Sequence, residues 1–305
     1  ISNNTSIIQE EVVVMSNKVY QMVTDRIIQE LESGNIPWRK PWTSCTLSSN
    51  VAYNRITRKP YSILNQMLLG QPGEYATYKQ WTSLGGHVRK GEKSSFVVYW
   101  NMLDVEEKDD NGELQKKQIP FLRYYNVFHI SQVDDVSPLE EENVQSDVNE
   151  FDLLTSAEEV LEAYVDREHL RFVESETSEA YYSPTKDEVV VPCRSRHISI
   201  NEFYSTAFHE LVHSTGHHNR LGRLVECRDA AFASDEYSKE ELIAEIGSAT
   251  LLNFLGVETS ETFKNSSGYI QGWLAALKSD AKLIVSASGK AAKAVDFILN
   301  QNITK

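Results

Sequence analysis

The sequence predicts an α+β protein with two domains, and three observations support this prediction. The chain has 305 residues, of which 41% are hydrophobic and 10% aromatic, and this is enough apolar material for two cores. Helical and strand patterns alternate in two separate groups along the chain. An acidic stretch that is poor in aromatic residues separates these groups. We therefore expect a first domain over residues 1–135, a linker over 136–153 and a second domain over 154–305.

The first half is expected to contain three helices and a hairpin. Apolar residues at helical spacing predict a helix over 18–32, which Gly34 ends. Two prolines are expected to keep the backbone of 36–42 extended. Two short helices are expected at 62–69 and 77–84. Two long strands are expected at 95–103 and 119–130, joined by a turn at 109–112.

The second half is expected to be mainly helical. Ser156 and Glu159 have the spacing of a capping box, which predicts a helix over 156–167. Short runs of β-branched and aromatic residues predict strands at 171–174 and 188–191. Four more helices are expected from their apolar periodicity, at 202–215, 238–255, 269–278 and 282–299.

The net charge of −14 is unevenly distributed along the chain. Residues 1–135 carry 15 basic and 15 acidic groups, whereas residues 136–305 carry 15 basic and 29 acidic groups. Halves of different charge usually have different partners. The net charge therefore argues against a nucleic-acid partner only when it is taken over the whole chain, because all of it lies in the second half.

The cysteine content indicates a reducing compartment. The three cysteines, Cys45, Cys193 and Cys227, form no CxxC pair, so neither a disulfide framework nor a cysteine-rich zinc site is expected. No apolar run approaches the roughly 18 residues that span a bilayer. The first residues also lack the basic-then-apolar pattern of a secretory signal. We expect a cytoplasmic protein without a membrane segment.

A metal site is predicted from the string His209-Glu210-Leu211-Val212-His213. Two histidines four residues apart lie on the same face of a helix, so that both imidazoles can reach one ion. Glu210, displaced by about 100° around the helix, can take a proton from the water that the metal activates. The alternative is a structural helix with two polar positions. The apolar residues in and before the motif would bury the helix, which favours the metal site.

The third ligand distinguishes two classes of zincin. The long HExxHxxGxxH form needs a histidine at position 219, where this chain has Asn219, and all four methionines precede the motif, so a later methionine turn is missing. The other class takes a glutamate from a second helix, and Glu241 and Glu245 share one helix face. We predict Glu241 as the third ligand and Glu245 as the carboxylate that orients a ligand histidine. The opposite assignment of the two glutamates stays open.

The expected ion is zinc. Manganese or another divalent ion is the alternative, because two imidazoles and one carboxylate suit several metals.

A second candidate site is a segment rich in cations and aromatic rings. Residues 36–100 contain nine basic and two acidic residues and four of the five tryptophans. Single-stranded nucleic acid is bound by cations along its backbone and by flat rings that stack on its bases. The alternative is that these rings belong to the core. The candidate DNA-binding residues are Trp38, Arg39, Lys40, Trp42, Arg55, Arg58, Lys59, Tyr61, Lys79, Trp81, Arg89, Lys90 and Lys93.

Several sequence blocks occur in an order that is typical of one family. These blocks are 36–42, 54–61, 78–81, 84–93, 208–213, 240–245 and 269–274. Together they resemble the ArdC-type antirestriction proteins of plasmids and other mobile elements, and the resemblance extends over residues 19–299. It departs from the family at residues 62–64 and at Ser94, where a glycine is commoner.

The resemblance implies an N-terminal domain that binds single-stranded DNA, joined to a zincin-like metallopeptidase domain. It also implies a role in protecting transferred DNA from host restriction enzymes. The first functional hypothesis is a metallopeptidase that acts on a protein substrate or a restriction enzyme. The second is a protein that shields single-stranded DNA and whose zincin domain is inert. The third is DNA mimicry by the acidic second half. The sequence specifies neither the peptide substrate nor the oligomeric state.

Overall fold

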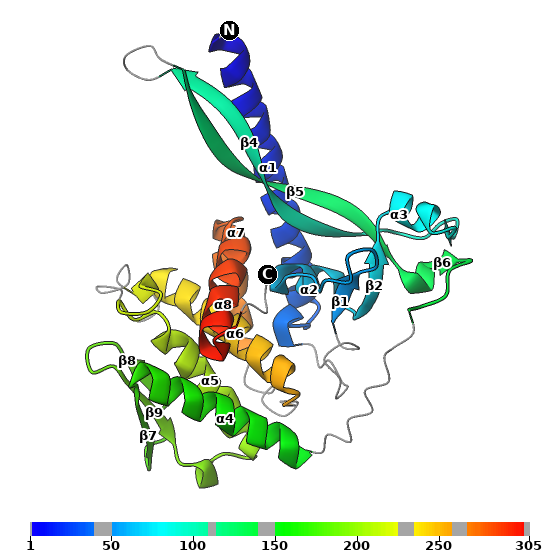
Figure 1. Cartoon of the computed structure of the whole chain (residues 1–305). Helices are drawn as coiled ribbons and strands as arrows, with labels where there is room; N and C mark the ends of the chain where they lie inside the picture. The colour runs from blue at the N-terminus through cyan, green and yellow to red at the C-terminus, as the bar shows by residue number, and fades with distance from the viewer. Residues whose placement is uncertain are drawn as a thin grey trace.

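The computed structural model of the chain describes residues 2–39, 51–108, 114–139, 150–224, 235–257 and 267–301. Helices and strands are mixed throughout, which confirms the α+β class (Figure 1). Within the described ranges, we find no helix whose length and apolar character would let it cross a bilayer.

A long antiparallel hairpin projects from the body of the molecule (Figure 1). It consists of strands β4 (Ser95–Lys108) and β5 (Leu114–His129), which are both longer than predicted. The turn expected at 109–112 lies outside the described residues. The base of the hairpin continues into a four-stranded sheet of order β1-β2-β5-β4, with β1 (Ala52–Asn54) parallel to β2 (Gly73–Ala76).

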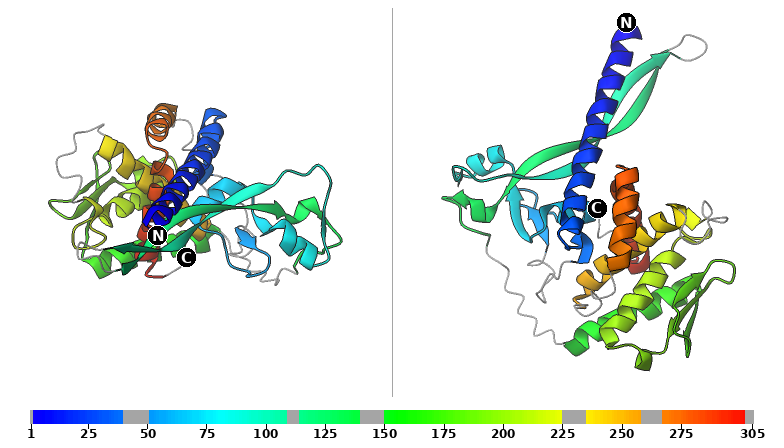
Figure 2. Two further views of the ribbon diagram at one scale, coloured as in Figure 1. Left: turned by 90° about the horizontal axis from the view of Figure 1, so that it is seen from above. Right: turned by 180° about the vertical axis from the view of Figure 1, so that it is seen from behind.

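Helix α1 (Ser2–Glu32) runs beside this hairpin (Figure 2). Val19, Val23 and Ile27 recur every four residues and are buried, so one side of the helix faces the core. Gly34 ends the helix with a left-handed φ of 84°. The helix begins well before the predicted range 18–32. It contacts β5, and the hydroxyl of Ser16, just before the predicted range, accepts a hydrogen bond from the backbone N–H of Leu122 on β5.

The remaining elements of the first half are short. Residues 36–42 were expected to be extended, but the described part forms the 3-10 helix η1 (Pro37–Arg39), whose buried Trp38 packs into the core. Thr77 precedes the helix that was predicted at 77–84 and forms a capping box with Gln80. The other elements are α2 (Ile63–Leu69), α3 (Tyr78–Ser83), β3 (His87–Val88), η2 (Ile130–Gln132) and β6 (Val133–Asp134).

The second half combines a small sheet with five helices of the described chain. Strands β7 (Arg171–Ser175), β9 (Glu188–Pro192) and β8 (Tyr181–Ser183) form a sheet in this order, and β8 was not predicted. Helix α4 (Glu150–Glu168) begins inside the predicted linker. The other elements are η3 (Arg194–Arg196), α5 (Ile200–Ser214), α6 (Asp235–Leu255), α7 (Ser267–Ser279) and α8 (Leu283–Leu299).

One large hydrophobic core spans both halves of the chain. It includes Val23 of α1 and Leu122 of β5 together with Phe208 of α5. Outside the apolar cluster, the hydroxyl of Thr24 on α1 donates a hydrogen bond of 2.8 Å to the carbonyl of Ala281, which precedes α8. The two halves therefore stabilise each other, because each buries apolar surface of the other.

Candidate metal centre

Helix α5 carries both histidines of the predicted motif. Ser199 precedes the helix, and its hydroxyl accepts a hydrogen bond from the backbone N–H of Glu202, which satisfies a free donor of the first turn. Phe208 and the other apolar residues of the helix are buried against α6, β8 and β9. This packing fixes the rotation of α5 and turns His209 and His213 toward α6.

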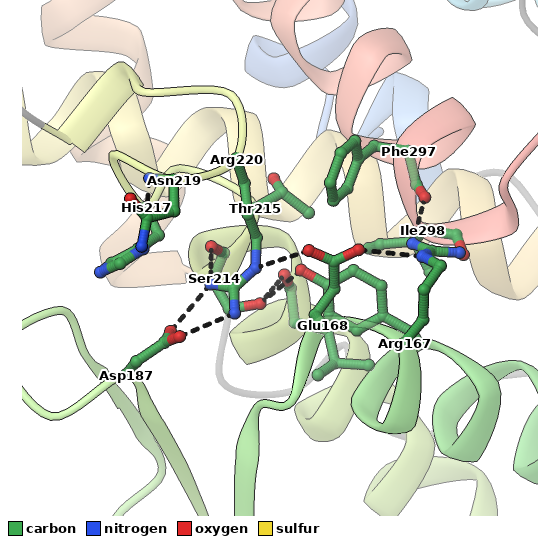
Figure 3. A network of polar contacts seen from close by, with 12 residues as sticks. Arg167, Glu168, Asp187, Ser214, Thr215, His217, Asn219, Arg220, Phe297 and Ile298 are labelled. Carbon is green, nitrogen blue, oxygen red and sulfur yellow. Dashed lines mark hydrogen bonds and ion pairs between the residues drawn. The ribbon is translucent and has the colours of Figure 1, made fainter.

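The C-terminal end of α5 is anchored by Arg220 (Figure 3). Its buried guanidinium donates hydrogen bonds to the carbonyl of Ser214, to Asp187 and to Glu168, at 3.0, 2.8 and 3.2 Å. Burial lowers the pKa of Arg220, but its bonds to Asp187 outweigh burial and the net pKa is raised, so the cation persists. The turn that follows α5 is therefore held to the residue that precedes β9 and to the last residue of α4.

Three side chains of α5 and α6 converge on one point. The ligand atoms of His209, His213 and Glu241 all lie within 4.8 Å of one another. The two Nε2 atoms are 3.1 Å apart, and each lies 3.4 Å from a carboxylate oxygen of Glu241. Bonds of about 2.0–2.1 Å in a tetrahedral site place neighbouring ligand atoms roughly 3.3 Å apart. The spacing of these three groups therefore fits a divalent ion.

The two glutamates that the sequence left as alternatives lie at different places. Glu241 faces both Nε2 atoms. Glu245, one turn further along α6, lies on the opposite side of His209, with its Oε1 atom 3.9 Å from Nδ1. Glu241 therefore lies where a ligand would be needed and Glu245 lies behind the histidine, and the assignment of these two roles stays a prediction.

Each histidine has a carboxylate behind it, and each carboxylate contacts an arginine. Behind His213, the Oε1 atom of Glu240 lies 3.3 Å from Nδ1, and Arg223 donates to Glu240 at 2.9–3.0 Å. Behind His209, Glu245 receives a hydrogen bond of 2.5 Å from Arg39. We call these two chains of contacts the Arg223 relay and the Arg39 relay.

Glu240 and Arg223 were missed by the sequence prediction. Glu240 stands directly before Glu241, so its contribution to a helix face could have been suspected. Arg223 lies in the segment after α5, where no spacing rule relates it to α6.

Carboxylates raise the pKa of both histidines in the metal-free cluster. Burial lowers the pKa of His213, but its contacts with Glu240 and Glu241 outweigh burial and raise the pKa to about 10. Burial also lowers the pKa of His209, and Glu241 again reverses the direction, so that the net pKa is raised. Burial by itself raises the pKa of Glu241, but hydrogen bonds to both histidines lower it well below its usual range.

Glu210 lies beside the cluster and is only 7% exposed. Its negative charge contributes to the raised pKa of both His209 and His213. The carboxylate is therefore close enough to act electrostatically on the cluster, although it belongs to a different face of α5 from the two histidines.

The candidate DNA-binding residues fall into different environments. Trp38, Trp81 and Tyr61 are buried, with Trp81 completely inaccessible. A base cannot stack on a buried ring, so the structure corrects this part of the prediction and assigns these rings to the core. Lys40 and Trp42 lie outside the described residues.

The predicted basic residues divide in the same way. Three arginines are engaged in ion pairs: Arg39 with Glu245, Arg55 with Glu74, and Arg89 with Glu92 and Asp134. The remaining described cations are exposed, and these are Arg58, Lys59, Lys79, Lys90 and Lys93. These five side chains lie at the surface of the described part of the chain.

An exposed aromatic cluster lies elsewhere, on one face of the hairpin. Tyr99 and Tyr125 are 43% and 37% exposed, with ring centroids 5.9 Å apart. The guanidinium of Arg123 lies 5.6 Å from the centroid of the Tyr125 ring. The sequence prediction missed this cluster because Tyr125 and Arg123 lie outside the basic segment. The strand alternation that places all three on one face is recognisable only once the pairing of β4 and β5 is known.

The fold and the cluster define a zincin-like protein, and comparison with known proteins extends this classification. Residues 159–290 match the zincin-like metallopeptidase family model, and residues 17–128 match the model of the N-terminal domain of the anti-restriction factor ArdC. The crystal structure of metal-free ArdC from plasmid R388 is 36% identical in sequence, with a TM-score of 0.70, and the alignment covers 92% of this chain and 96% of that one. The chain therefore belongs to the ArdC antirestriction family.

A second ArdC structure and two sequence relatives complete the comparison. The Mn(II)-bound structure of the R388 protein, at 32% identity and a TM-score of 0.70, aligns with 92% of this chain and 97% of that one, and it indicates that the fold binds a divalent ion. An Escherichia coli DNA primase TraC is 32% identical over 92% of this chain. The uncharacterized protein y4eC of Sinorhizobium fredii is 30% identical over 92% of this chain and 91% of its own length. The chain spans only 27% of the length of that TraC protein.

Proposed function

We propose that this ArdC-family chain is a metal-dependent peptidase whose N-terminal half binds single-stranded DNA. The observation that supports the peptidase part is the convergence of His209, His213 and Glu241 within 4.8 Å, next to the buried carboxylate of Glu210. The target is a protein substrate, with a restriction enzyme as the candidate that the family relationship suggests.

In this proposal each residue of the cluster has one task. His209, His213 and Glu241 hold the ion, which supplies Lewis acidity toward a carbonyl and lowers the pKa of water. Glu210 accepts a proton from the attacking water and passes it to the nitrogen of the cleaved peptide bond. The hydroxyl remains on the carbonyl carbon, so that one water is added across the bond. We propose zinc as the ion, and manganese or another divalent ion as the alternative.

The peptidase proposal is tested with Glu210→Gln in the full-length chain. Glutamine keeps the size of the side chain but cannot accept the proton, so cleavage of fluorescein-labelled casein should fall by about 100-fold or more. Metal content, measured by elemental analysis after dialysis, should stay unchanged. Glu162→Gln, at an exposed position of α4, is the matched control. Equal cleavage by wild type and Glu210→Gln would refute the proposal.

The alternative is a protein that shields single-stranded DNA and has no peptidase activity. Under this alternative, Glu210→Gln leaves protection of DNA from restriction intact, and wild type cleaves neither casein nor a restriction enzyme. Measuring cleavage and protection on the same two proteins separates the two functions.

For DNA binding we propose the hairpin face that carries Tyr99, Tyr125 and Arg123. The two exposed rings offer flat surfaces to bases, and the guanidinium beside them offers a charge to phosphates. Tyr61, whose ring lies 6.5 Å from Tyr99, connects this face to a loop with the exposed cation Lys59. Tyr99 thus lies near both Tyr125 and Tyr61.

The DNA-binding proposal is tested by fluorescence anisotropy with a labelled oligothymidylate. Because each base–ring stack is worth about 1–3 kcal/mol, the double variant Tyr99→Ala/Tyr125→Ala should weaken binding by about tenfold or more. Tyr181→Ala removes a ring of similar exposure from the second half and should leave binding unchanged. Affinity should also fall as salt is raised. Full affinity of the double variant would exclude this face.

A further inference from the structure

We infer that Arg39, which belongs to the N-terminal half, is a positioning residue of the metal centre and sets its affinity for the ion. Arg39 does so through Glu245, which lies behind His209. This inference rests on the metal centre proposed above but concerns a residue that we first predicted to contact DNA.

The contacts of Glu245 place it between a ligand histidine and a cation. Its Oε2 atom accepts a hydrogen bond of 2.5 Å from the Nη2 atom of Arg39, and its Oε1 atom faces Nδ1 of His209 at 3.9 Å. The side chains of Arg39 and Glu245 are 19% and 13% exposed, so water screens their attraction only in part. The ion pair therefore limits the orientations that the carboxylate can adopt beside His209.

The Arg223 relay supports the same interpretation from within the molecule. There a carboxylate behind the other ligand histidine, Glu240 behind His213, is held by the guanidinium of Arg223. Behind each imidazole ring thus lies a carboxylate, and behind each carboxylate lies a guanidinium. Two similar arrangements around one cluster indicate a shared task, which is to fix the orientation of each ligand ring.

The backbone next to Arg39 is itself fixed, as a positioning role requires. Arg39 ends the 3-10 helix η1, which contacts α6. The preceding residue, Trp38, is buried and packs edge-on against Trp273 of α7, with ring centroids 5.1 Å apart. The guanidinium therefore extends from an anchored position and not from a free loop.

The expected consequence is a change in metal affinity. Carboxylates that hold a ligand histidine typically change metal affinity by about 10–100-fold when they are lost. Without Arg39 the Glu245 carboxylate remains but is free to rotate away from His209. We therefore expect Arg39→Ala to weaken metal binding by about tenfold, the lower end of that range.

The experiment measures Mn²⁺ binding to the metal-free full-length chain by the electron paramagnetic resonance signal of free Mn²⁺. Arg39→Ala should bind about tenfold more weakly than wild type, and Arg39→Lys, which keeps a cation near Glu245, should recover part of the loss. Arg196→Ala is the matched control, because Arg196 forms a partly exposed ion pair with Glu176 that does not involve the cluster. Equal affinity of wild type and Arg39→Ala would overturn the inference.

Two further measurements separate positioning from a merely structural role. With Co²⁺ in the site, the visible absorption spectrum reports the ligand arrangement, and Arg39→Ala should change its shape while circular dichroism stays that of the wild type. Adding Arg39→Ala to Glu245→Gln should cause little further loss of affinity, since both changes act on one relay. Fully additive losses together with an unchanged spectrum would contradict positioning through Glu245. If wild type itself bound no Mn²⁺, the metal centre would fail, which is a different result from equal binding by both proteins.

Discussion

The Arg223 relay and the Arg39 relay have the same chemistry but differ in burial and in sequence separation. Arg223 and Glu240 are both nearly inaccessible and lie 17 residues apart within the second half. Arg39 and Glu245 are more accessible and lie 206 residues apart, one in each half. The comparison indicates that His213 is oriented by residues of the zincin-like half alone, whereas His209 depends on contact between the two halves.

The largest expected difference between the relays concerns stability. Arg223→Met removes a buried cation from Glu240 and leaves His213 beside the carboxylate, so the free energy of unfolding of the metal-free protein should fall by about 3 kcal/mol, the lower end of the range for a broken buried ion pair. Arg39→Met should cost only about 1–2 kcal/mol, because water can partly replace the lost hydrogen bond at Glu245.

Urea unfolding in the presence of EDTA measures this difference. The control is Arg196→Met, which breaks a partly exposed ion pair and should cost less than about 1 kcal/mol. Equal losses for Arg223→Met and Arg39→Met would show that the two relays do not differ in the way that their burial indicates.

A smaller difference is expected in metal affinity when the carboxylates are neutralised. Glu240→Gln should weaken Mn²⁺ binding by up to about 100-fold, and Glu245→Gln by about tenfold, because Glu240 approaches its histidine at 3.3 Å and Glu245 only at 3.9 Å. Titration calorimetry of both variants tests the order. A stronger effect at Glu245 would make the Arg39 relay the dominant one.

The smallest difference between the relays concerns pH. The pKa of His213 is raised to about 10, so in the metal-free protein this ring is largely protonated near neutrality, and the pKa of His209 is also raised. Because an ion binds only the neutral ring, binding expels protons, and affinity should increase with pH by about tenfold per unit for each proton released. A measurement of Mn²⁺ affinity at pH 7 and pH 8 tests the sign.

The relays should differ here as well. Glu240→Gln removes a carboxylate that raises the pKa of His213, so the dependence on pH should become shallower. Glu245 contributes less to the pKa of His209 than Glu241 does, so Glu245→Gln should leave the dependence nearly unchanged. Affinity that is independent of pH in the wild type would mean that the rings are already neutral.

The sequence predicted those parts of the molecule that local patterns determine. The apolar spacing around His209 predicted α5, and the pair Glu241 and Glu245 predicted one face of α6. The N-terminal extension of α1 was missed because it contains three consecutive valines, which favour strands, and because its support comes from the distant hairpin. Strand β8 was missed because it has only three residues.

The partners of the cluster could not be predicted from local patterns. No periodicity relates Arg39 to a glutamate 206 residues later, so its cationic side chain was interpreted as a DNA contact. Composition also could not tell Trp38 and Trp81, which are buried, from Tyr99, which is exposed. In each case a long-range packing contact, and not residue type, decides the role.

The common core has a consequence for how such a unit can be moved between proteins. Cutting the chain between β6 and α4 would expose the apolar sides of α1 and α8 to water and would remove Arg39 from the cluster. A fragment carrying only the HExxH motif would then be prone to self-association and would bind its ion weakly. A larger polypeptide that acquires this unit by recombination must therefore inherit the N-terminal helix and the HExxH helix together.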